Sequence, residues 1–150
     1  MYNYEENNMG LISEILPCLF MGGSSDIIIK SHEKLQNRAP KYNLVITHYD
    51  LAQKYHSKVK EIRLCYPDSS INYIDTKKLT KTVSQAYNTW SRGGKVLVRC
   101  QAGLNRSGLT VALILLRAGY KASDAINLIR MRRSYNALNN EEYVLFIESQ

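Results

Sequence analysis

One stretch of the sequence decides the fold: KVLVRCQAGLNRSG, residues 95–108. Its apolar run Val96–Val98 predicts a strand that is buried on both faces of a sheet. A helix is predicted to follow from about Ser107 to Arg117, where Gly119 closes it. The short loop between them lies at the carboxyl end of the strand, where α/β folds gather their functional sites.

This loop has the form of an anion-binding cradle. Six successive backbone N–H groups can converge there on a helix N-terminus: those of Gln101, Ala102, Gly103, Leu104, Asn105 and Arg106. Gly103 lets the backbone turn inward and approach a ligand closely. The guanidinium of Arg106 adds a planar fork of donors that can grip two phosphoryl oxygens at once. The loop therefore predicts a binding site for a phosphate dianion.

Cys100 ends the predicted strand and lies in the field of the same helix N-terminus. A thiol placed there beside an arginine exists largely as thiolate near neutral pH, and the thiolate is the nucleophile. Ser107 can donate a hydrogen bond to the sulfur when the sulfur leaves again. The Cys-x5-Arg spacing alone is weak, but the strand before it and the apolar helix after it make the pattern specific. Cys100 is thus predicted to attack a bound phosphate ester.

Outward from this stretch, predicted strands alternate with predicted helices. The further strands are Ile12–Phe20, which Pro17 makes an edge strand or two short ones, Leu44–Ile46 and Val59–Tyr66, with a turn at Gly22–Ser25. The further helices are Ile27–Gln36, one capped by Asp75 and stopped at Gly93, one capped by Ser123, and one begun by Asn139 and Glu142. The pattern predicts an α/β fold with a mostly parallel central sheet flanked by helices.

Length and composition favour one domain. The chain has 150 residues, 45% of them hydrophobic and 22% charged, which is ordinary for a folded domain. We expect a single domain over residues 11–150 after a flexible tail at 1–10. Lysine and arginine outnumber the acids 20 to 13, and the resulting net charge of +7 suits an anionic partner.

The same sequence bears on compartment and assembly. Three cysteines are too few for a disulfide framework, so a reducing compartment is expected. No signal peptide or membrane-spanning run is visible, which predicts a cytoplasmic protein. We expect a monomer.

The decisive stretch resembles the signature loop of cysteine-dependent protein tyrosine phosphatases, and the chain length resembles that of their dual-specificity group. Glu14–Gly22 resembles the N-terminal strand pair of that group, and Ser123–Arg133 followed by Asn139 resembles its C-terminal helices, where an asparagine often supports the loop. The resemblance covers roughly residues 11–150. It implies hydrolysis of phosphotyrosine, and of phosphoserine or phosphothreonine, in proteins through a phosphocysteine at Cys100. It implies no metal and no cofactor.

A general acid is expected upstream of the nucleophile. Tyr66-Pro67-Asp68 resembles the Trp-Pro-Asp loop of the larger enzymes of the superfamily, and a separation of 32 residues (100 − 68) from Cys100 is typical of it. Chemistry requires such a group as well, because an alkoxide or phenolate leaves poorly unless it is protonated. Asp68 is therefore the predicted acid. Asp75 is the rival, more simply explained as a helix cap.

Arg99 departs from the family pattern, which has histidine immediately before the cysteine. An arginine there can add positive potential to the site, or it can point away from it. Cys65 either forms a reversible disulfide with Cys100 or packs as a small buried side chain. Basic side chains at Arg130, Arg132 and Arg133, with Lys77, Lys78 and Lys81, can form a rim around the site. The three histidines have no metal-site spacing.

Two other functions remain open at this stage. Gly103-Leu104-Asn105-Arg106 resembles the loop of RNA 5′-triphosphatases and related RNA phosphatases of the same superfamily, and a charge of +7 is compatible with RNA. No run of interleaved aromatic residues marks a platform for single-stranded RNA. The third possibility is a phosphate-binding module without catalysis. Such a module is expected to lack Cys100, Arg106 or Asp68, and all three are present.

Overall fold

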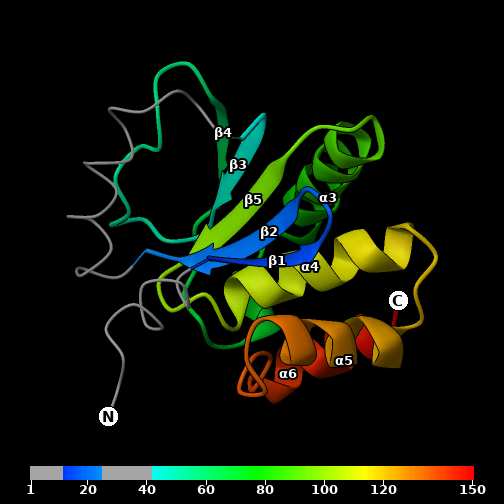
Figure 1. The fold of residues 1–150 in the computed structure, drawn as a ribbon. Coiled ribbons are helices and arrows are strands. Elements are labelled where there is room, and N and C mark those ends of the chain that lie inside the picture. The colour runs from blue at the N-terminus through cyan, green and yellow to red at the C-terminus, as the bar shows by residue number, and fades with distance from the viewer. Residues whose placement is uncertain (1–11, 25–41) are drawn as a thin grey trace, which may run out of the picture.

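A five-stranded sheet is the framework of the computed structural model, which describes residues 12–24 and 42–150. Its strands are β1 (Ile12–Leu16), β2 (Leu19–Gly23), β3 (Leu44–Thr47), β4 (Lys60–Arg63) and β5 (Val96–Cys100). Their spatial order is β1-β2-β5-β3-β4, so β5 is central (Figure 1). Only the β1–β2 pair is antiparallel among these strands. The predicted mostly parallel α/β fold is confirmed.

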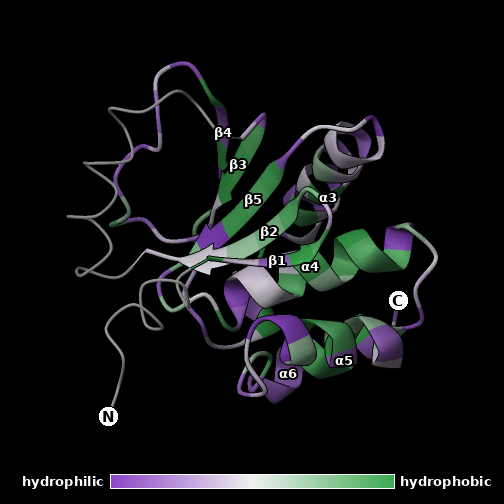
Figure 2. Cartoon of the chain, in the orientation of Figure 1, coloured by the Kyte–Doolittle hydropathy of each residue, from purple (hydrophilic) through white to green (hydrophobic). Residues whose placement is uncertain are grey.

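Two of the three inner strands, β3 and β5, are buried along their whole length, as their continuous apolar runs predict. In the hydropathy colouring of Figure 2 both are mostly green, and only the carboxyl end of β5 is purple. Pro17 divides the predicted N-terminal strand into β1 and β2. The turn predicted at Gly22–Ser25 is wrong in its first half, because Gly22 and Gly23 are the last residues of β2 and pair with Arg99 and Cys100.

Helices cover one face of the sheet (Figure 1). They are α3 (Thr76–Ser91), α4 (Arg106–Arg117), α5 (Ala122–Arg132) and α6 (Glu141–Glu148), with a short 3₁₀ turn η1 (Ile71–Tyr73). Helix α4 packs against β2 and β5 and is covered in turn by α3, α5 and α6. Val96 and Val98 of β5 face this helical core, whereas Leu97 joins a smaller cluster on the opposite face.

Helix starts follow the predictions in part. The Asp75 side chain caps α3 by accepting from the Lys78 N–H, as expected. Ser123 does not cap α5, which already begins at Ala122, so this prediction is wrong. The cap of α6 is Asn140 rather than Asn139. The Asn139 side chain is already occupied, because its oxygen accepts a hydrogen bond from the Asn105 amide.

Two predictions, the tail at 1–10 and the helix Ile27–Gln36, lie outside the described residues. Within residues 12–24 and 42–150, no helix is long and apolar enough to cross a membrane.

Candidate active site

The loop between β5 and α4 surrounds the thiol of Cys100. Cys100 is the last residue of β5 and is almost fully buried. The Gly103 N–H points at its Sγ, with a nitrogen–sulfur distance of 3.3 Å. The Ser107 Oγ lies 3.3 Å from the same Sγ, at hydrogen-bond distance. The fold therefore places two polar groups of the loop and of α4 directly on the sulfur.

The carbonyl groups of the loop are bound from outside it. Those of residues 100–104 accept hydrogen bonds as follows: Cys100 from Ser24 Oγ, Gln101 from Ser24 N–H, Ala102 and Gly103 from the Arg133 guanidinium, and Leu104 from Leu138 N–H. In a trans peptide the N–H points opposite to the C=O. Because five successive carbonyls face outward, the N–H groups of residues 101–105 face the interior of the loop. These are five of the six N–H groups of the predicted cradle; that they bind a phosphate stays a prediction.

Gly103 is required by both conformation and space. Its φ is +74°, a left-handed conformation that favours glycine. A Cβ on Gly103 would lie 2.6 Å from the Gly22 carbonyl carbon and 2.7 Å from the Gly23 nitrogen. A Cβ on Gly23 would lie 2.7 Å from the Gln101 oxygen. The loop thus packs backbone against backbone on the end of β2.

Arg106 begins α4 and is 9% exposed. One terminal nitrogen donates to the Tyr66 carbonyl at 3.1 Å and to the His48 carbonyl at 3.4 Å. The Tyr49 ring lies 5.7 Å from its guanidinium carbon. Its Nε is buried and has no hydrogen-bond partner among the described residues. A buried donor without a partner is costly, and a phosphoryl oxygen would satisfy it.

Asp68 lies beside the loop although it is 32 residues away in sequence. Its Oδ2 accepts from the Asn105 side-chain amide at 2.9 Å, and its Oδ1 accepts from the Asn140 amide at 2.9 Å. Asn105 belongs to the loop itself, so the carboxylate is tied directly to the cradle. The rival Asp75 caps α3 instead and bonds to Lys78. The fold brings Asp68 to the loop and assigns Asp75 a helix-capping contact.

His48 is fully buried beneath this site, at the end of β3. Its Nδ1 donates to the Leu64 carbonyl at 2.7 Å, so its Nε2 accepts from the Thr110 hydroxyl at 2.7 Å. Burial lowers the pKa of His48 to about 4, and the charge of Arg106 contributes to the shift. The neutral ring therefore links two parts of the fold: Leu64, in the segment between β4 and Asp68, and Thr110 in helix α4.

The shifted pKa of His48 predicts a pH-dependent stability. Because its folded pKa of about 4 lies below the unfolded value of 6.5, the unfolded chain binds the proton first. The stabilisation is complete above pH 6.5 and is lost as the pH falls toward 4. Between pH 7.5 and pH 5 we expect a loss of about 2 kcal/mol, or about 4–8 °C in melting temperature.

Thermal unfolding followed by circular dichroism at both pH values measures this loss. The variant His48→Gln should show a flatter dependence over this window. The matched control His56→Gln should keep the dependence of the wild-type protein. An unchanged slope in His48→Gln would contradict the assignment.

Other predicted residues lie away from the sulfur. Arg99 alternates with Cys100 along β5 and bonds to Glu61 and Thr47 on the opposite face of the sheet, so it points away from the site. Cys65 is exposed rather than buried, and the three cysteines are free thiols. Its disulfide with Cys100 stays a prediction. Residues 12–24 and 42–150 contain no cluster of three or more His, Cys, Asp or Glu side chains that could hold a metal.

Sequence reasoning missed several residues that shape the loop. Arg133 was expected at a basic rim, yet it turns inward to the loop carbonyls, and Arg130 bonds the Ala137 and Leu138 carbonyls. Ser24 reaches the loop from the end of β2. The contacts of Arg133 and Ser24 with the loop join positions 30 and 76 residues apart. No local sequence pattern predicts these contacts. The helical spacing of Arg130 and Arg133 was nevertheless a usable signal.

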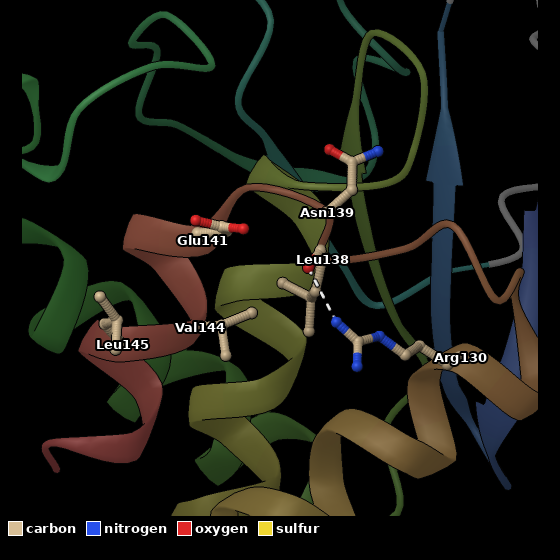
Figure 3. A pocket seen from close by; sticks show the side chains of 6 residues that line it. All are labelled: Arg130, Leu138, Asn139, Glu141, Val144 and Leu145. Carbon is tan, nitrogen blue, oxygen red and sulfur yellow. Dashed lines mark hydrogen bonds between the residues drawn. The ribbon is translucent and has the colours of Figure 1, made fainter.

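Two cavities lie near this end of the molecule. One of about 350 Å³ adjoins the loop and is lined by Asp50, Cys65, Tyr66, Pro67 and Arg106. The other, of about 450 Å³, lies between α5 and α6 (Figure 3). In Figure 3 its Arg130 points to the Leu138 carbonyl, and this bond occupies the guanidinium. The first cavity is lined by Arg106 of the loop, whereas the second is lined by apolar side chains, by Glu141 and by the hydrogen-bonded Arg130 and Asn139.

Comparison with known proteins agrees with the geometry. The family described as "Dual specificity phosphatase, catalytic domain" matches residues 19–147, most of the chain. The chain belongs to this family. The segment that matches the dual-specificity phosphatase family contains residues 100–106 as well as Asp68.

Two named relatives share parts of this dual-specificity phosphatase domain. The tyrosine-protein phosphatase CDC14 of Saccharomyces cerevisiae is 26% identical over 129 residues, which are 85% of this chain and 21% of the yeast protein. The human protein tyrosine phosphatase type IVA 3 is 44% identical over 50 residues, 33% of this chain and 28% of the human protein. The chain spans well under half the length of either relative.

Solved structures show the same fold. Human DUSP28 superposes with a TM-score of 0.74 at 20% identity, over 93% of each chain. A human tyrosine phosphatase-like serine/threonine/tyrosine-interacting protein superposes with a TM-score of 0.69 at 22% identity, over 92% of this chain and 93% of its own. At these identities the dual-specificity phosphatase fold is shared, and function must be argued from the site.

Proposed function

We propose that the chain is a metal-independent phosphatase that hydrolyses phosphotyrosine in proteins through a phosphocysteine intermediate at Cys100. Phosphoserine and phosphothreonine are candidate further substrates. The observation that carries the proposal is the convergence of three groups on one loop. The Cys100 thiol, the unpartnered Nε of Arg106 and the Asp68 carboxylate all lie at residues 100–106 or bond to them.

In the first step the Cys100 thiolate attacks phosphorus and a sulfur–phosphorus bond forms. The N–H groups of the loop and the fork of Arg106 hold the phosphoryl oxygens and stabilise their charge in the transition state. The bond from phosphorus to the substrate oxygen breaks. Asp68 gives its proton to that oxygen, which leaves as a neutral phenol or alcohol.

In the second step a water molecule attacks the phosphocysteine. Asp68, now a carboxylate, accepts the proton of the water, and the sulfur–phosphorus bond breaks. Ser107 donates a hydrogen bond to the departing sulfur, from the position in which its Oγ lies 3.3 Å away. Inorganic phosphate leaves, and the thiolate is restored.

The two amides on Asp68 support its role as the acid. Asn105 and Asn140 each donate to one carboxylate oxygen, so the group is held from both oxygens at once. Each oxygen has a further lone pair, and a proton can occupy one of these without loss of the amide contacts. The acid is therefore oriented before a substrate arrives, which lowers the entropic cost of proton transfer.

The RNA alternative rests on Asn105 in the loop sequence. In this structure the Asn105 side chain is engaged inside the protein with Asp68, Asn139 and Asn140. It is thus explained by the placement of the acid and gives no separate support to nucleotide recognition. A binding module without catalysis has no need for the contact between Asp68 and the loop.

Parallel kinetic assays test the proposal. We expect kcat/KM for a phosphotyrosyl peptide to exceed that for triphosphate-ended RNA of matched charge by at least about tenfold, about 1.4 kcal/mol in transition-state binding. A phosphoseryl peptide of the same sequence measures the preference among proteins. All assays include a chelator, which should leave the rate unchanged. Preference for RNA, or chelator inactivation that divalent ions reverse, would overturn the proposal.

A further inference from the structure

A group of three charged side chains, two of them buried, lies on the face of the sheet opposite to Cys100. It consists of Glu61, Arg63 and Arg99, called here the Arg–Glu cluster. The Arg99 and Glu61 side chains are 2% and 4% exposed and bond at 3.1 Å, and Arg63 bonds the same carboxylate at 2.9 Å. Arg99 Nε also donates to the Thr47 hydroxyl at 2.9 Å, and that hydroxyl donates to Glu61.

The cluster binds the backbone of an irregular segment, residues 49–55, that follows β3. Five backbone groups are involved: the carbonyls of Tyr49, Asp50 and Ala52 accept from Arg63, the carbonyl of Gln53 accepts from Arg99, and the N–H of Tyr55 donates to Glu61. The Tyr55 ring also lies 5.6 Å from the Arg99 guanidinium carbon. Outside a sheet or helix, such backbone groups need partners of this kind.

The first residues of this segment contact the phosphate-binding arginine. The Tyr49 ring lies 5.7 Å from the guanidinium carbon of Arg106, and the neighbouring His48 carbonyl lies 3.4 Å from an Arg106 nitrogen. Asp50 lines the cavity beside Arg106. A continuous set of contacts therefore runs from the Arg–Glu cluster, through the backbone of residues 49–55, to Arg106.

The cluster is an expensive way to gain stability alone. The Arg99 guanidinium and the Glu61 carboxylate are removed from water and lose hydration, and an apolar substitute often serves stability as well. Burial alone would raise the pKa of Glu61, but the hydrogen bonds from Thr47 and Tyr55 and the charge of Arg99 hold it below its ordinary value. The carboxylate is therefore charged at neutral pH. Guanidinium groups supply something that apolar side chains cannot, namely a planar fork of N–H donors that holds several backbone carbonyls at once.

We propose that Arg99 is a positioning residue for phosphate binding, which acts with Glu61 and Arg63 by holding residues 49–55 so that Tyr49 and His48 fix the orientation of Arg106. This inference rests on the proposed phosphatase site. It explains how an arginine before the nucleophile serves the site without facing it.

The variant Arg99→Met tests the inference, with inorganic phosphate as the probe. We expect calorimetric Kd for phosphate, and KM for a phosphotyrosyl peptide, to rise about tenfold, equivalent to about 1.4 kcal/mol. Both are measured well below the melting temperature, so that the protein is folded. Arg99→Lys keeps the charge but cannot bond three partners in one plane, so its Kd should lie between those of Arg99→Met and the wild type.

A purely structural role predicts a different result. Val83→Ala removes core volume in α3, away from the site, and should lower the melting temperature while Kd and KM stay unchanged. If Arg99→Met lowers the melting temperature but leaves Kd and KM within twofold of the wild type, the inference is wrong. Should Arg99→Met fail to fold, Arg63→Gln removes three of the five backbone contacts at a partly exposed position and must give the same rise in Kd. A wild-type protein that neither binds phosphate nor hydrolyses the peptide would refute the proposed function instead.

Discussion

Replacement of Cys100 with serine should abolish turnover while the protein still binds its substrate. The serine hydroxyl does not ionise near neutral pH, so the nucleophile is lost, and we expect kcat to fall by at least about 10⁴-fold. The cradle should remain, because the carbonyls of residues 100–104 are held by Ser24, Arg133 and Leu138 rather than by the sulfur. Calorimetry with a phosphotyrosyl peptide should therefore give a Kd close to the wild-type KM.

Cys18→Ser is the matched control, because Cys18 lies in the turn between β1 and β2, at the other end of β2 from the loop. Its kcat should equal that of the wild type. Turnover of Cys100→Ser within tenfold of wild type would rule out the covalent mechanism. The same serine variant can retain physiological substrates from an extract, and this is the most direct route to their identity.

Asp68→Asn should slow phosphotyrosine hydrolysis by about 10²–10⁴-fold, the usual contribution of a general acid. The phenol of tyrosine has a pKa near 10 and needs a proton as it leaves. An aryl phosphate with a much more acidic phenol should lose less, because its phenolate leaves unaided. Rapid mixing isolates the first chemical step, which is the proper comparison because we also expect Asp68 to assist the later hydrolysis.

The control for this variant is Asp75→Asn. Asparagine caps a helix about as well as aspartate, so α3 should keep its start and the rate should stay near that of the wild type. Equal losses for the two substrates in Asp68→Asn would show that the residue is not the acid. A larger loss in Asp75→Asn would show that the other carboxylate is.

The features predicted best from the sequence are those that depend on neighbouring residues. The apolar run Val96–Val98 predicts β5 and its central place, since only a strand covered on both faces is apolar at every position. A strand followed at once by a helix then fixes the loop between Cys100 and Arg106. The sequence also singles out Asp68, because leaving-group chemistry demands an acid and a Pro-Asp turn follows a strand, and the fold places this residue beside the loop.

Other features depend on contacts between residues far apart in the sequence, and these could not be predicted from local patterns. Asn139 and Asn140 are equivalent in a local pattern, and the contact between Asn139 and Asn105 decides which of them caps α6. Arg133 looked like a surface charge because its acceptors are backbone carbonyls 30 residues away, which carry no residue identity. The direction of Arg99 depended in the same way on Glu61, 38 residues distant.

The close packing of Gly103 on the end of β2 has a consequence for the evolution of new specificities. A side chain at Gly103 or Gly23 would collide with main-chain atoms, which cannot move aside as a flexible side chain can. Substitutions at Gly103 and Gly23 are therefore expected to be selected against. Any homologue that keeps the geometry of the loop should keep glycine at both positions. Asp50 and Cys65, by contrast, line the cavity beside the loop with exposed side chains. We therefore expect changes of specificity to arise at these exposed positions, while the backbone of the loop stays the same.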